Sequence, residues 1–500
     1  AGQSSGAGQS SGAGQSSGAG QSSGADEASH VPQSDVERIL DGFWPYRRST
    51  TSYRRIPVEP VDRSALLEQM TALAHGEDEQ GDRGTVSGSL YSGDHDHYAF
   101  LGQIFDLFSH ANVLQRDMYP SATKFEGEII AMTSDLLHGT GVGVVTSGGS
   151  ESLITALFSY REQARSERGV TQPNVVMPTT AHVALDKGAH WMNIEVRHAP
   201  LGADYRADVD AMADLVDDNT ICVVGSAANY AHGLIDPIER IADLAQSRGI
   251  GMHVDGCLGG WLLPWVERLG YQVPLWDFRV PGVTSISANT HKYSYGLKGS
   301  SVLLNRTKEL RQNQYFTYPD WPGGLYLSPG LAGSRSGGLI ASTYAAILAT
   351  GESGYLSAAD AIMRTSVAIT DGIRRDLPDL EVIGEPTFLV AFKAADPTSL
   401  DIYHVNDALK AAGWRMNSLQ LPPALHFCVT RPNTKPGTAE SFLEALTAAV
   451  AYAKDRHGQP AESGAMYGFG GTPQGNATIA TIMSGVLDAM HEVAPQDAAP

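Results

Sequence analysis

The sequence predicts an α/β protein built around a mostly parallel sheet with helices on both faces, followed by a smaller α/β lobe. Two observations support this fold class. Short β-branched apolar runs alternate with amphipathic helical stretches through the middle of the chain, which is typical of parallel strands joined by helical crossovers. After Gly338 this alternation gives way to one long helix and then to short strands and helices, which indicates a second lobe.

The individual elements are predicted from local patterns. Strands of the larger lobe are expected where short, largely β-branched runs are bounded by turn-forming residues, at 142–146, 174–177, 220–225, 250–254, 283–287 and 300–304. Amphipathic helices are expected at 151–168, from about 181, and at 237–248. In the smaller lobe the strand candidates are 382–383, 388–392 and 426–430.

The chain of 500 residues is long enough for more than one domain, and it divides into four predicted regions. Residues 1–24 are four copies of AGQSSG, an uncharged polar repeat that cannot bury a core and is expected to be a flexible, non-native segment. Residues 25–110 are predicted to form an N-terminal helical segment. A large domain is expected at 111–345 and a small C-terminal domain at 346–500.

The composition argues against a nucleic-acid partner and a membrane helix, and it favours a cytoplasmic location. Lys and Arg number 35 and Asp and Glu 55, a net charge of −20, which argues against a nucleic-acid partner because phosphate backbones require clustered cations. The three cysteines, Cys222, Cys257 and Cys428, form no CxxC pair, so no metal site or disulfide framework is expected. No apolar run approaches the ~20 residues of a membrane helix. We therefore expect a soluble, cytoplasmic protein without an integral membrane segment.

Lys292 is the first candidate for chemistry. It follows a predicted strand within the run SANTHK, and ligands gather at the carboxyl ends of parallel strands. A lysine in this position can form a Schiff base with an aldehyde cofactor when its surroundings depress its pKa. The alternative is a solvated surface lysine, which is what most lysines are, so the assignment depends on neighbouring motifs.

Asp255 ends the apolar run GMHV and therefore lies at the end of the preceding predicted strand. A carboxylate there is costly to bury unless it is paired. The pyridinium nitrogen of pyridoxal phosphate (PLP) is a fitting partner, because the carboxylate keeps that nitrogen protonated. The alternative is a structural or helix-capping aspartate. Together, Asp255 and Lys292 favour a PLP site.

Two glycine-rich turns can bind the phosphate of such a cofactor. Residues 147–150 (SGGS) join a strand to a helix, where glycine permits close approach and the helix offers free N–H groups. Residues 333–338 (GSRSGG) precede the long helix and offer a second candidate clamp. His182, near another helix start, can stack on the cofactor ring. The alternatives are ordinary loops and a structural histidine.

A series of separated motifs in a fixed order carries a specific resemblance. Over most of residues 84–490 the chain resembles the sphingosine-1-phosphate lyases, in the group II decarboxylase branch of the fold-type I PLP enzymes. The motifs are HVDGCLGG at 253–260, DFRVPGVTSISA at 277–288, THKY at 290–293, KGSS at 298–301, WPGG at 321–324, AGSR at 332–335, LPP at 421–423, HFC at 426–428 and AMYG at 465–468.

The resemblance implies a fold-type I PLP-dependent architecture and a role for each matching residue. Such enzymes are homodimers with shared active sites. In this sequence Lys292 would hold PLP as a Schiff base, His291 would contact the cofactor phosphate, Asp255 would pair with the pyridine nitrogen and His182 would stack over the ring. The remaining implied positions are Gly149 and Ser150 at the phosphate, Ser334 reaching it from the partner subunit, Tyr91 in the active site, Asn112 and Lys298 near the substrate phosphate, and Tyr230 and Cys257 close to the cofactor.

Gln115 departs from the family, which usually has a histidine at this position that is associated with the substrate phosphate. Glutamine can donate a hydrogen bond but cannot carry charge. The departure implies that the head group is held differently, that activity is weakened, or that the substrate has changed.

The implied activity is cleavage of the C2–C3 bond of sphingosine 1-phosphate, or of a similar phosphorylated long-chain base, to a long-chain aldehyde and phosphoethanolamine. The base that takes the C3 hydroxyl proton is left open between Tyr91, Lys292 and a phosphate oxygen of the ligand. An amino-acid decarboxylase of the same group is the first alternative, and a PLP-fold protein without activity is the second. Asn112, Gln115 and Lys298 favour a phosphate over an α-carboxylate.

Overall fold

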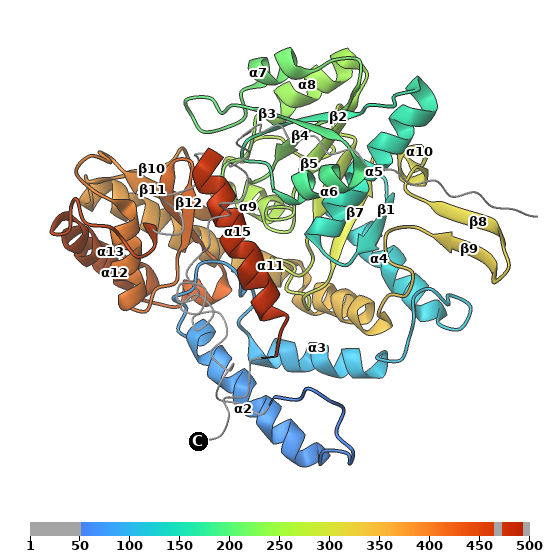
Figure 1. The fold of residues 1–500 in the computed structure, drawn as a ribbon, viewed down its shortest axis with the longest axis horizontal. Coiled ribbons are helices and arrows are strands. Elements are labelled where there is room, and N and C mark those ends of the chain that lie inside the picture. Colours follow the sequence, from blue (N-terminus) through green and yellow to red (C-terminus); the bar gives the residue numbers. More distant parts are fainter. Residues whose placement is uncertain (1–51, 465–472, 494–500) are drawn as a thin grey trace, which may run out of the picture. The chain divides into compact units, whose positions relative to one another are not determined.

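The computed structural model describes residues 52–464 and 473–493 of the chain (Figure 1). The chain divides into two compact units. The AGQSSG repeat and the AMYG motif at 465–468 lie outside the described residues. The described part of the first unit comprises 52–61 and 473–493; it contains α15 (Pro473–Met490), and Arg54 Nη2 donates a 3.1 Å hydrogen bond to the Val493 carbonyl. The second unit, residues 62–469, contains both sheets described below.

A seven-stranded sheet forms the centre of the large unit. Its strands lie in the order β1 (Gly143–Thr146), β7 (Ser301–Asn305), β6 (Ser285–Ala288), β5 (Gly251–Asp255), β4 (Thr220–Ser226), β2 (Asn174–Pro178) and β3 (Glu195–Ala199). The pairs from β6 to β3 are parallel, whereas β7 is antiparallel to both of its neighbours. The predicted mostly parallel sheet is therefore confirmed.

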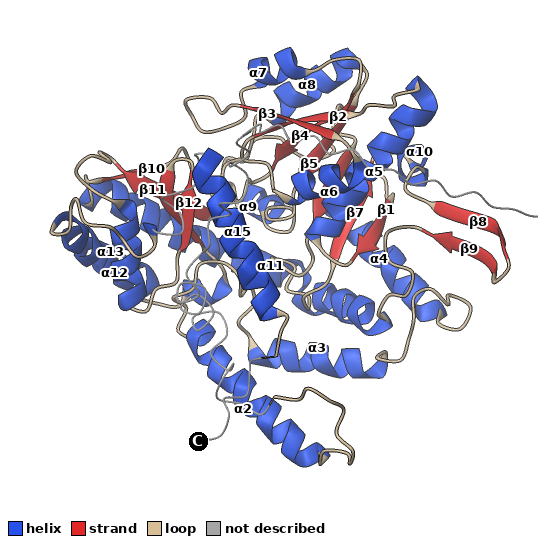
Figure 2. Ribbon diagram, in the orientation of Figure 1, coloured by secondary structure: helices blue, strands red, loops and turns tan. Residues whose placement is uncertain are grey.

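Alternate residues of the strands face two different cores. Val223 of β4 belongs to one apolar cluster, while its neighbours Cys222 and Val224 belong to the other. Because successive side chains of a strand point to opposite faces, the sheet is buried on both sides. The helices that supply this cover (Figure 2) include α4 (Pro120–Leu136), α5 (Gly149–Arg168), α6 (Ala184–Met192), α7 (Val209–Leu215), α8 (Ile238–Arg248), α9 (Leu263–Arg268) and α10 (Lys308–Gln312).

The direction of β7 was not predicted from the sequence. The run 300–304 reads like the earlier strands, but no helix lies between β6 and β7. A parallel connection needs a crossover, usually helical, so a chain that turns back without one pairs in the antiparallel direction. The sequence prediction also missed β3, an edge strand whose residues are largely polar and of which only Ala199 is buried.

The second sheet is antiparallel and has four strands, in the order β10 (Leu380–Val382), β11 (Leu389–Ala394), β13 (Pro423–Cys428) and β12 (Asn417–Gln420). The chain of this lobe also forms α12 (Ile402–Ala411), between β11 and β12, and α13 (Thr438–Lys454), after β13. A 3₁₀ turn, η2 (Arg431–Thr434), lies between β13 and α13. The three strand candidates of the smaller lobe fall on β10, β11 and β13. The long α11 (Gly337–Asp376) spans residue 345, so the division at that position stays a prediction.

The N-terminal part of the large unit reaches the small sheet. After α2 (Arg63–Asp82), the 86–91 segment runs beside β13, where Gly88 N–H donates to the Cys428 carbonyl and Cys428 N–H donates to Ser87 Oγ, both at 2.9 Å. This segment leads into α3 (His95–Leu107). Within residues 52–464 and 473–493, no helix is long and apolar enough to cross a membrane.

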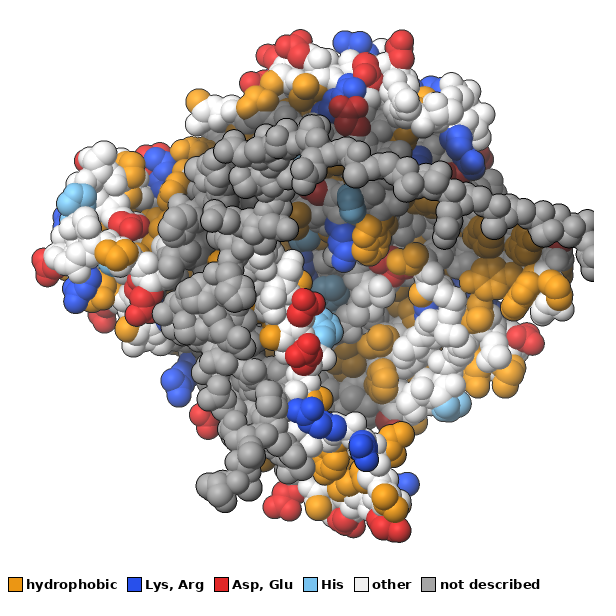
Figure 3. Space-filling view, in the orientation of Figure 1, with side chains coloured by type: hydrophobic (Ala, Val, Ile, Leu, Met, Phe, Trp, Pro, Cys, Tyr) orange, Lys and Arg blue, Asp and Glu red, His pale blue; other side chains and the backbone are white. Residues whose placement is uncertain are grey.

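Two further strands, β8 (Phe316–Trp321) and β9 (Gly324–Ser328), form a separate antiparallel hairpin that no sequence pattern predicted. Every residue of β8 is exposed, and Leu325 and Leu327 of β9 are 80% and 65% exposed. Hydrophobic side chains gather over this hairpin on the face shown in Figure 3. The hairpin thus presents apolar surface that the described part of this chain does not bury.

Candidate active site

The carboxyl edge of the large sheet collects the predicted cofactor residues. The register pairs Ser226 with Asp255, Asp255 with Ser287, Ala288 with Val302, and Ser301 with Thr146. One end of the sheet, the carboxyl edge, therefore collects the segments that follow β1, β4, β5 and β6 and the segment that precedes the antiparallel β7. Ligands of open α/β sheets bind at this edge.

Lys292 lies half-buried in this edge, in the turn after β6. Burial is the main influence on the pKa of His291, Lys298, Cys257 and Cys428, and the positive charge of Lys292 lowers the pKa of all four. Its ammonium is therefore surrounded by side chains from three separate stretches of the chain. A solvated surface lysine would not affect so many neighbours.

Lys298 supplies a second cation beside Lys292. Its Nζ donates a 2.9 Å hydrogen bond to the Ser89 carbonyl and lies 4.7 Å from the centre of the Tyr91 ring. Desolvation, reinforced by the charge of Lys292, lowers the pKa of Lys298 to about 8. Two neighbouring cations favour an anionic ligand between them.

Asp255 is held at the end of β5 with 7% of its surface exposed. Its Oδ1 accepts hydrogen bonds from the Cys257 N–H at 3.0 Å and from Ser287 Oγ at 3.4 Å. Both of these bonds end on the same oxygen, which fixes the carboxylate and leaves Oδ2 for another donor. His253, two residues earlier on the strand, is fully buried, and burial lowers its pKa to about 4.

The turn before α5 is shaped for close approach. Gly148 has a φ of 152°, and a Cβ on Gly149 would lie 2.7 Å from Asn289 Nδ2 and 3.0 Å from Cys257 Sγ. Any side chain at Gly149 would fill the space, so glycine is required there. Ser150 follows in the first turn of α5, where backbone N–H groups point outward.

His291 lies beside this turn, with Cε1 3.7 Å from the Cβ position of Gly148. Its Nδ1 accepts a 3.4 Å hydrogen bond from the Ser300 N–H. Burial, together with Lys298 and Lys292, lowers the pKa of His291 to about 4, so the ring is neutral. A neutral ring that accepts at Nδ1 carries its hydrogen on Nε2 and can donate it to a phosphate.

These residues fit PLP. The sheet edge offers a primary amine on Lys292, a fixed carboxylate on Asp255, and a glycine turn at a helix N-terminus. Asn289, which no motif singled out, has a buried Oδ1 without a hydrogen-bond partner among the described residues. A buried polar atom left unpaired beside Gly149 indicates that a further group belongs there.

Tyr91 comes from the 86–91 segment and closes the site from the side of the small sheet. Its ring packs edge-on against Tyr293 with centroids 5.1 Å apart, and 8% of its surface is exposed. Burial, followed by the neighbouring Cys428 and Tyr230, holds the pKa of Tyr91 well above its usual value of 10. The phenol therefore stays protonated and acts as a hydrogen-bond donor at neutral pH.

Tyr230 and His182 extend the site along the sheet edge. Tyr230 follows β4, is 48% exposed, and contributes to the raised pKa of Tyr91. His182 follows β2 and is half-buried; its Nδ1 accepts a 3.1 Å hydrogen bond from the Ala184 N–H. No contact between His182 and Lys292 is present among the described interactions, so stacking over the cofactor stays a prediction.

Three predicted residues form a separate group at the surface, in which Gln115 and Ser334 are exposed and Asn112 is half-buried. Asn112 Nδ2 donates to Ser334 Oγ at 3.0 Å, and Asn112 Oδ1 accepts from the Leu114 N–H at 3.0 Å and the Arg335 N–H at 3.2 Å. We call these three residues the exposed trio; no described contact joins them to Lys292 of the same chain.

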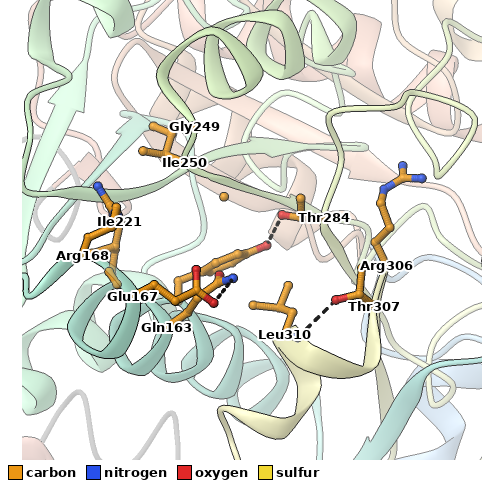
Figure 4. A pocket seen from close by; sticks show the side chains of 13 residues that line it. Gln163, Glu167, Arg168, Ile221, Gly249, Ile250, Thr284, Arg306, Thr307 and Leu310 are labelled. Carbon is orange, nitrogen blue, oxygen red and sulfur yellow. Dashed lines mark hydrogen bonds between the residues drawn. The ribbon is translucent and has the colours of Figure 1, made fainter.

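The opposite edge of the sheet contains a cavity of about 220 Å³ between α5 and the residues that precede β5 and β6 (Figure 4). The Tyr160 hydroxyl at its base already bonds with the Met252 carbonyl, Thr284 Oγ1 and Ser285 Oγ, at 3.1, 2.7 and 2.6 Å. This cavity lies at the amino ends of the strands and contains none of the predicted site residues.

The fold and the residues at the carboxyl edge define a PLP-dependent enzyme, and residues 78–395 match the family described as the pyridoxal-dependent decarboxylase conserved domain. The sphingosine-1-phosphate lyase of Dictyostelium discoideum is 39% identical over 87% of this chain and 81% of its own length. The Arabidopsis thaliana enzyme is 39% identical over 82% and 76%. The chain therefore belongs to the sphingosine-1-phosphate lyase family.

Solved structures agree with this assignment. The sphingosine-1-phosphate lyase of Burkholderia pseudomallei superposes with a TM-score of 0.83 at 44% identity, covering 90% of this chain and 99% of its own. A Lactobacillus brevis glutamate decarboxylase, 19% identical, superposes with a TM-score of 0.69 over 84% of this chain and 98% of its own, and it shows the shared fold alone. The predicted fold-type I architecture is confirmed.

Proposed function

We propose that this protein cleaves the C2–C3 bond of sphingosine 1-phosphate, or of a similar phosphorylated long-chain base, to a long-chain aldehyde and phosphoethanolamine. The observation that carries the proposal is the second cation, Lys298, beside Lys292 at the sheet edge. When Lys292 holds the cofactor, Lys298 remains as a cation that can bind the substrate phosphate. When bound, PLP supplies an electron sink for the charge left at C2 as the bond breaks.

The chain's own groups orient and polarise that cofactor. Lys292 would hold it covalently, and Asp255 Oδ2 would keep a proton on the pyridine nitrogen. The backbone N–H groups of Gly149 and Ser150 and the Nε2–H of His291 would bind its phosphate. His182 would cover the ring, and Cys257 would lie close to it. Each of these groups is fixed by a strand end or a helix start, which preorganises the site.

The base for the C3 hydroxyl proton is narrowed by the surroundings of Tyr91. Because its phenol is neutral, Tyr91 would donate a hydrogen bond to the C3 oxygen and would not remove the proton. Lys292, once it is displaced from the cofactor, and a phosphate oxygen of the substrate remain the candidates. The ring of Tyr91 also keeps the ammonium of Lys298 in place, since the two lie in cation–π contact.

We further propose a homodimer in which each exposed trio contributes to the partner's active site. Ser334 would reach the cofactor phosphate there, and Asn112 and Gln115 would approach the substrate head group. Gln115 and Ser334 lie exposed on the surface, and no described contact joins them to Lys292 of the same chain, which supports this proposal. Arg335, next to Ser334, is tied to the buried Glu126 at 2.7 Å and to the Val145 carbonyl at 3.1 Å, so the trio is rigidly presented.

Uncovered apolar surface near the trio supports the same dimer. The β8–β9 hairpin contains a single charged residue, Asp320, and leads directly to Ser334. Large apolar patches of this kind mark interfaces. The exposed apolar residues are Phe316, Tyr318, Trp321, Leu325 and Leu327 on the hairpin, Leu331 after it, Leu107 on α3, and Leu114 and Met118 between α3 and α4.

We also propose a cytoplasmic location. Cys222, Cys257 and Cys428 are all free and buried, and none is placed to form a disulfide with another. A thiol-only cysteine set suits a reducing compartment.

The test is a product assay. Purified protein with PLP is incubated with sphingosine 1-phosphate, and the long-chain aldehyde and phosphoethanolamine are quantified by mass spectrometry, with Lys292→Ala as the control. We expect both products in equal amounts from the wild type and neither from the variant. Release of CO2 from amino acids with no aldehyde would replace the lyase by the decarboxylase alternative.

A further inference from the structure

His426 is a fully buried histidine on β13 that none of the assigned roles uses. It belongs to the HFC motif with Cys428, and two residues on a strand apart point to the same face. Phe427, between them, faces the other way and packs against Phe442 with ring centroids 4.8 Å apart. Cys428 Sγ lies 3.3 Å from the Tyr293 hydroxyl, so the face that carries His426 is directed towards the active site.

The imidazole of His426 holds the loop that follows β4. Its Nδ1 lies 3.0 Å from the Ala231 carbonyl, and a carbonyl oxygen can only accept a hydrogen bond. Nδ1 therefore carries the hydrogen. Burial lowers the pKa of His426 to about 4, so the ring is neutral and stays in this one tautomer at neutral pH.

The imidazole of His426 also contacts the side chain of Tyr230, the residue before Ala231. The rings of His426 and Tyr230 pack in a T-shape, with centroids 4.9 Å apart and an interplanar angle of 83°. One buried side chain thus restrains both the backbone at Ala231 and the aromatic ring of Tyr230. Tyr230 in turn affects the pKa of Tyr91, so it lies within electrostatic reach of the phenol at the site.

A histidine at position 426 buries one ring nitrogen without a hydrogen-bond partner in the described part of the chain, which destabilises the folded protein. Nε2 of His426 is buried without a hydrogen-bond partner among the described residues. A leucine or phenylalanine would avoid that unpaired nitrogen, but neither could donate to Ala231. The strand itself is fixed independently of the imidazole, because Ser87 Oγ donates to the His426 carbonyl and accepts from the Cys428 N–H. The imidazole is therefore not needed to hold β13 in place.

We propose that His426 is a positioning residue that fixes Tyr230 in the active site by binding its loop and its ring together. This role rests on the lyase function proposed above. His426 touches neither the substrate nor the cofactor in this account, and it acts through Tyr230. Removing its N–H donor releases the Ala231 carbonyl and lets the tyrosine ring move while the strand and the cofactor site remain formed.

The test is a double-mutant cycle on the holoenzyme with His426→Phe, Tyr230→Ala and the double variant. His426→Phe keeps a ring but loses the donor, and we expect kcat/KM to fall about 10- to 100-fold, as for other displacements of a site group. In the Tyr230→Ala background the same substitution should change kcat/KM less than about twofold, because coupled residues are not additive. His426→Asn can still donate from Nδ2 to Ala231 and should lie between His426→Phe and the wild type.

His404 provides the matched control. It is also buried, and its Nε2 contacts a backbone carbonyl, that of Gln459, at 2.9 Å, but it lies on α12 away from the site. His404→Phe should lower the melting temperature without changing kcat/KM of the folded fraction. Equal fold-losses from His426→Phe with and without Tyr230, or a loss no larger than that of His404→Phe, would overturn the proposal.

A second readout separates this proposal from the lyase function. The change in cofactor absorbance on adding sphingosine 1-phosphate reports binding at the site whether or not the C2–C3 bond breaks. We expect His426→Phe and Tyr230→Ala to alter this signal alike and non-additively. If the wild type releases no aldehyde, the proposed reaction fails while the absorbance cycle still decides the role of His426, and additive absorbance changes would reject it.

Discussion

The two halves of the proposed active site differ in how the chain holds them. The Lys292 half is assembled within one chain, because Asp255, His291, Lys298 and Tyr91 are brought together at one sheet edge by strand register and by the 86–91 segment. In the exposed trio, Asn112 and Ser334 are joined by a hydrogen bond, and Gln115 and Ser334 face outward. In the proposed dimer, one chain supplies most of the cofactor site, and the exposed trio of the second copy would complete that site and contribute to substrate selection. Substitutions in the two halves should therefore fail in different ways.

Lys292→Ala should have the largest effect. Loss of the amine proposed to hold the cofactor covalently should lower kcat by about 10⁴-fold or more, the scale seen when a covalent catalyst is removed. Aldehyde release measures the rate, and borohydride treatment followed by peptide mass spectrometry locates the adduct. Lys308→Ala, an exposed lysine on α10, is the matched control and should behave as wild type. A cofactor adduct on another lysine would break the assignment.

Asp255→Asn should have the second-largest effect on the rate. The amide keeps the shape of the carboxylate but loses the charge that retains a proton on the cofactor, and a charge-assisted hydrogen bond of this kind corresponds to about 100-fold in kcat. Because Asp255 belongs to the Lys292 half, the absorbance of bound cofactor should change along with the rate. If the variant has the cofactor spectrum and the kcat of the wild type, Asp255 does not pair with the pyridine nitrogen of the cofactor.

The KM for the substrate should depend on pH through the charge of Lys298. Its pKa, lowered to about 8 by desolvation and by Lys292, means that the ammonium is present below pH 8 and lost above it. An anionic substrate therefore binds more weakly as pH rises, and KM should increase about tenfold between pH 7 and 9, one unit past the pKa. Lys298→Arg should move this rise to higher pH, since arginine keeps its charge. A flat KM profile in the wild type contradicts the role of Lys298.

Gln115→His should have the smallest effect and should act on the exposed half alone. A histidine of ordinary pKa, about 6.5, is largely charged at pH 6, where KM for the phosphorylated substrate should fall about two- to fivefold, and the gain should vanish at pH 8.5. The cofactor spectrum should not change. Gln312→His, on exposed α10, is the control. Unchanged kinetics at both pH values would remove position 115 from the head-group site.

The sequence identified six of the seven strands of the large sheet, because each of the six is a compact, largely β-branched run. It could not supply the direction of β7, since periodicity carries no direction, and it missed β3 because an exposed edge strand such as Glu195–Ala199 lacks the apolar pattern. The β8–β9 hairpin was missed because its apolar residues lie outside, which contradicts the pattern that a folded monomer leads one to expect.

The candidate site shows the same limit. Lys292, Asp255 and the SGGS turn could be predicted because each follows or precedes a recognisable strand. Asn289 and His426 could not, because their significance lies in an unpaired buried atom that only the folded chain reveals. The pairing of Asn112 with Ser334 joins residues 222 positions apart, and no local pattern predicts a contact at that separation.

Subunit complementation tests the two-half site most directly. Lys292→Ala subunits are mixed with Asn112→Ala/Gln115→Ala subunits, dimers are exchanged, and aldehyde release from sphingosine 1-phosphate is measured. If the exposed trio serves the partner, each mixed dimer contains one doubly defective site and one intact site, so activity should return although neither parent is fully active. If the trio acts within its own chain, no mixed dimer contains an intact site, and activity that stays at the average of the two parents would contradict the account.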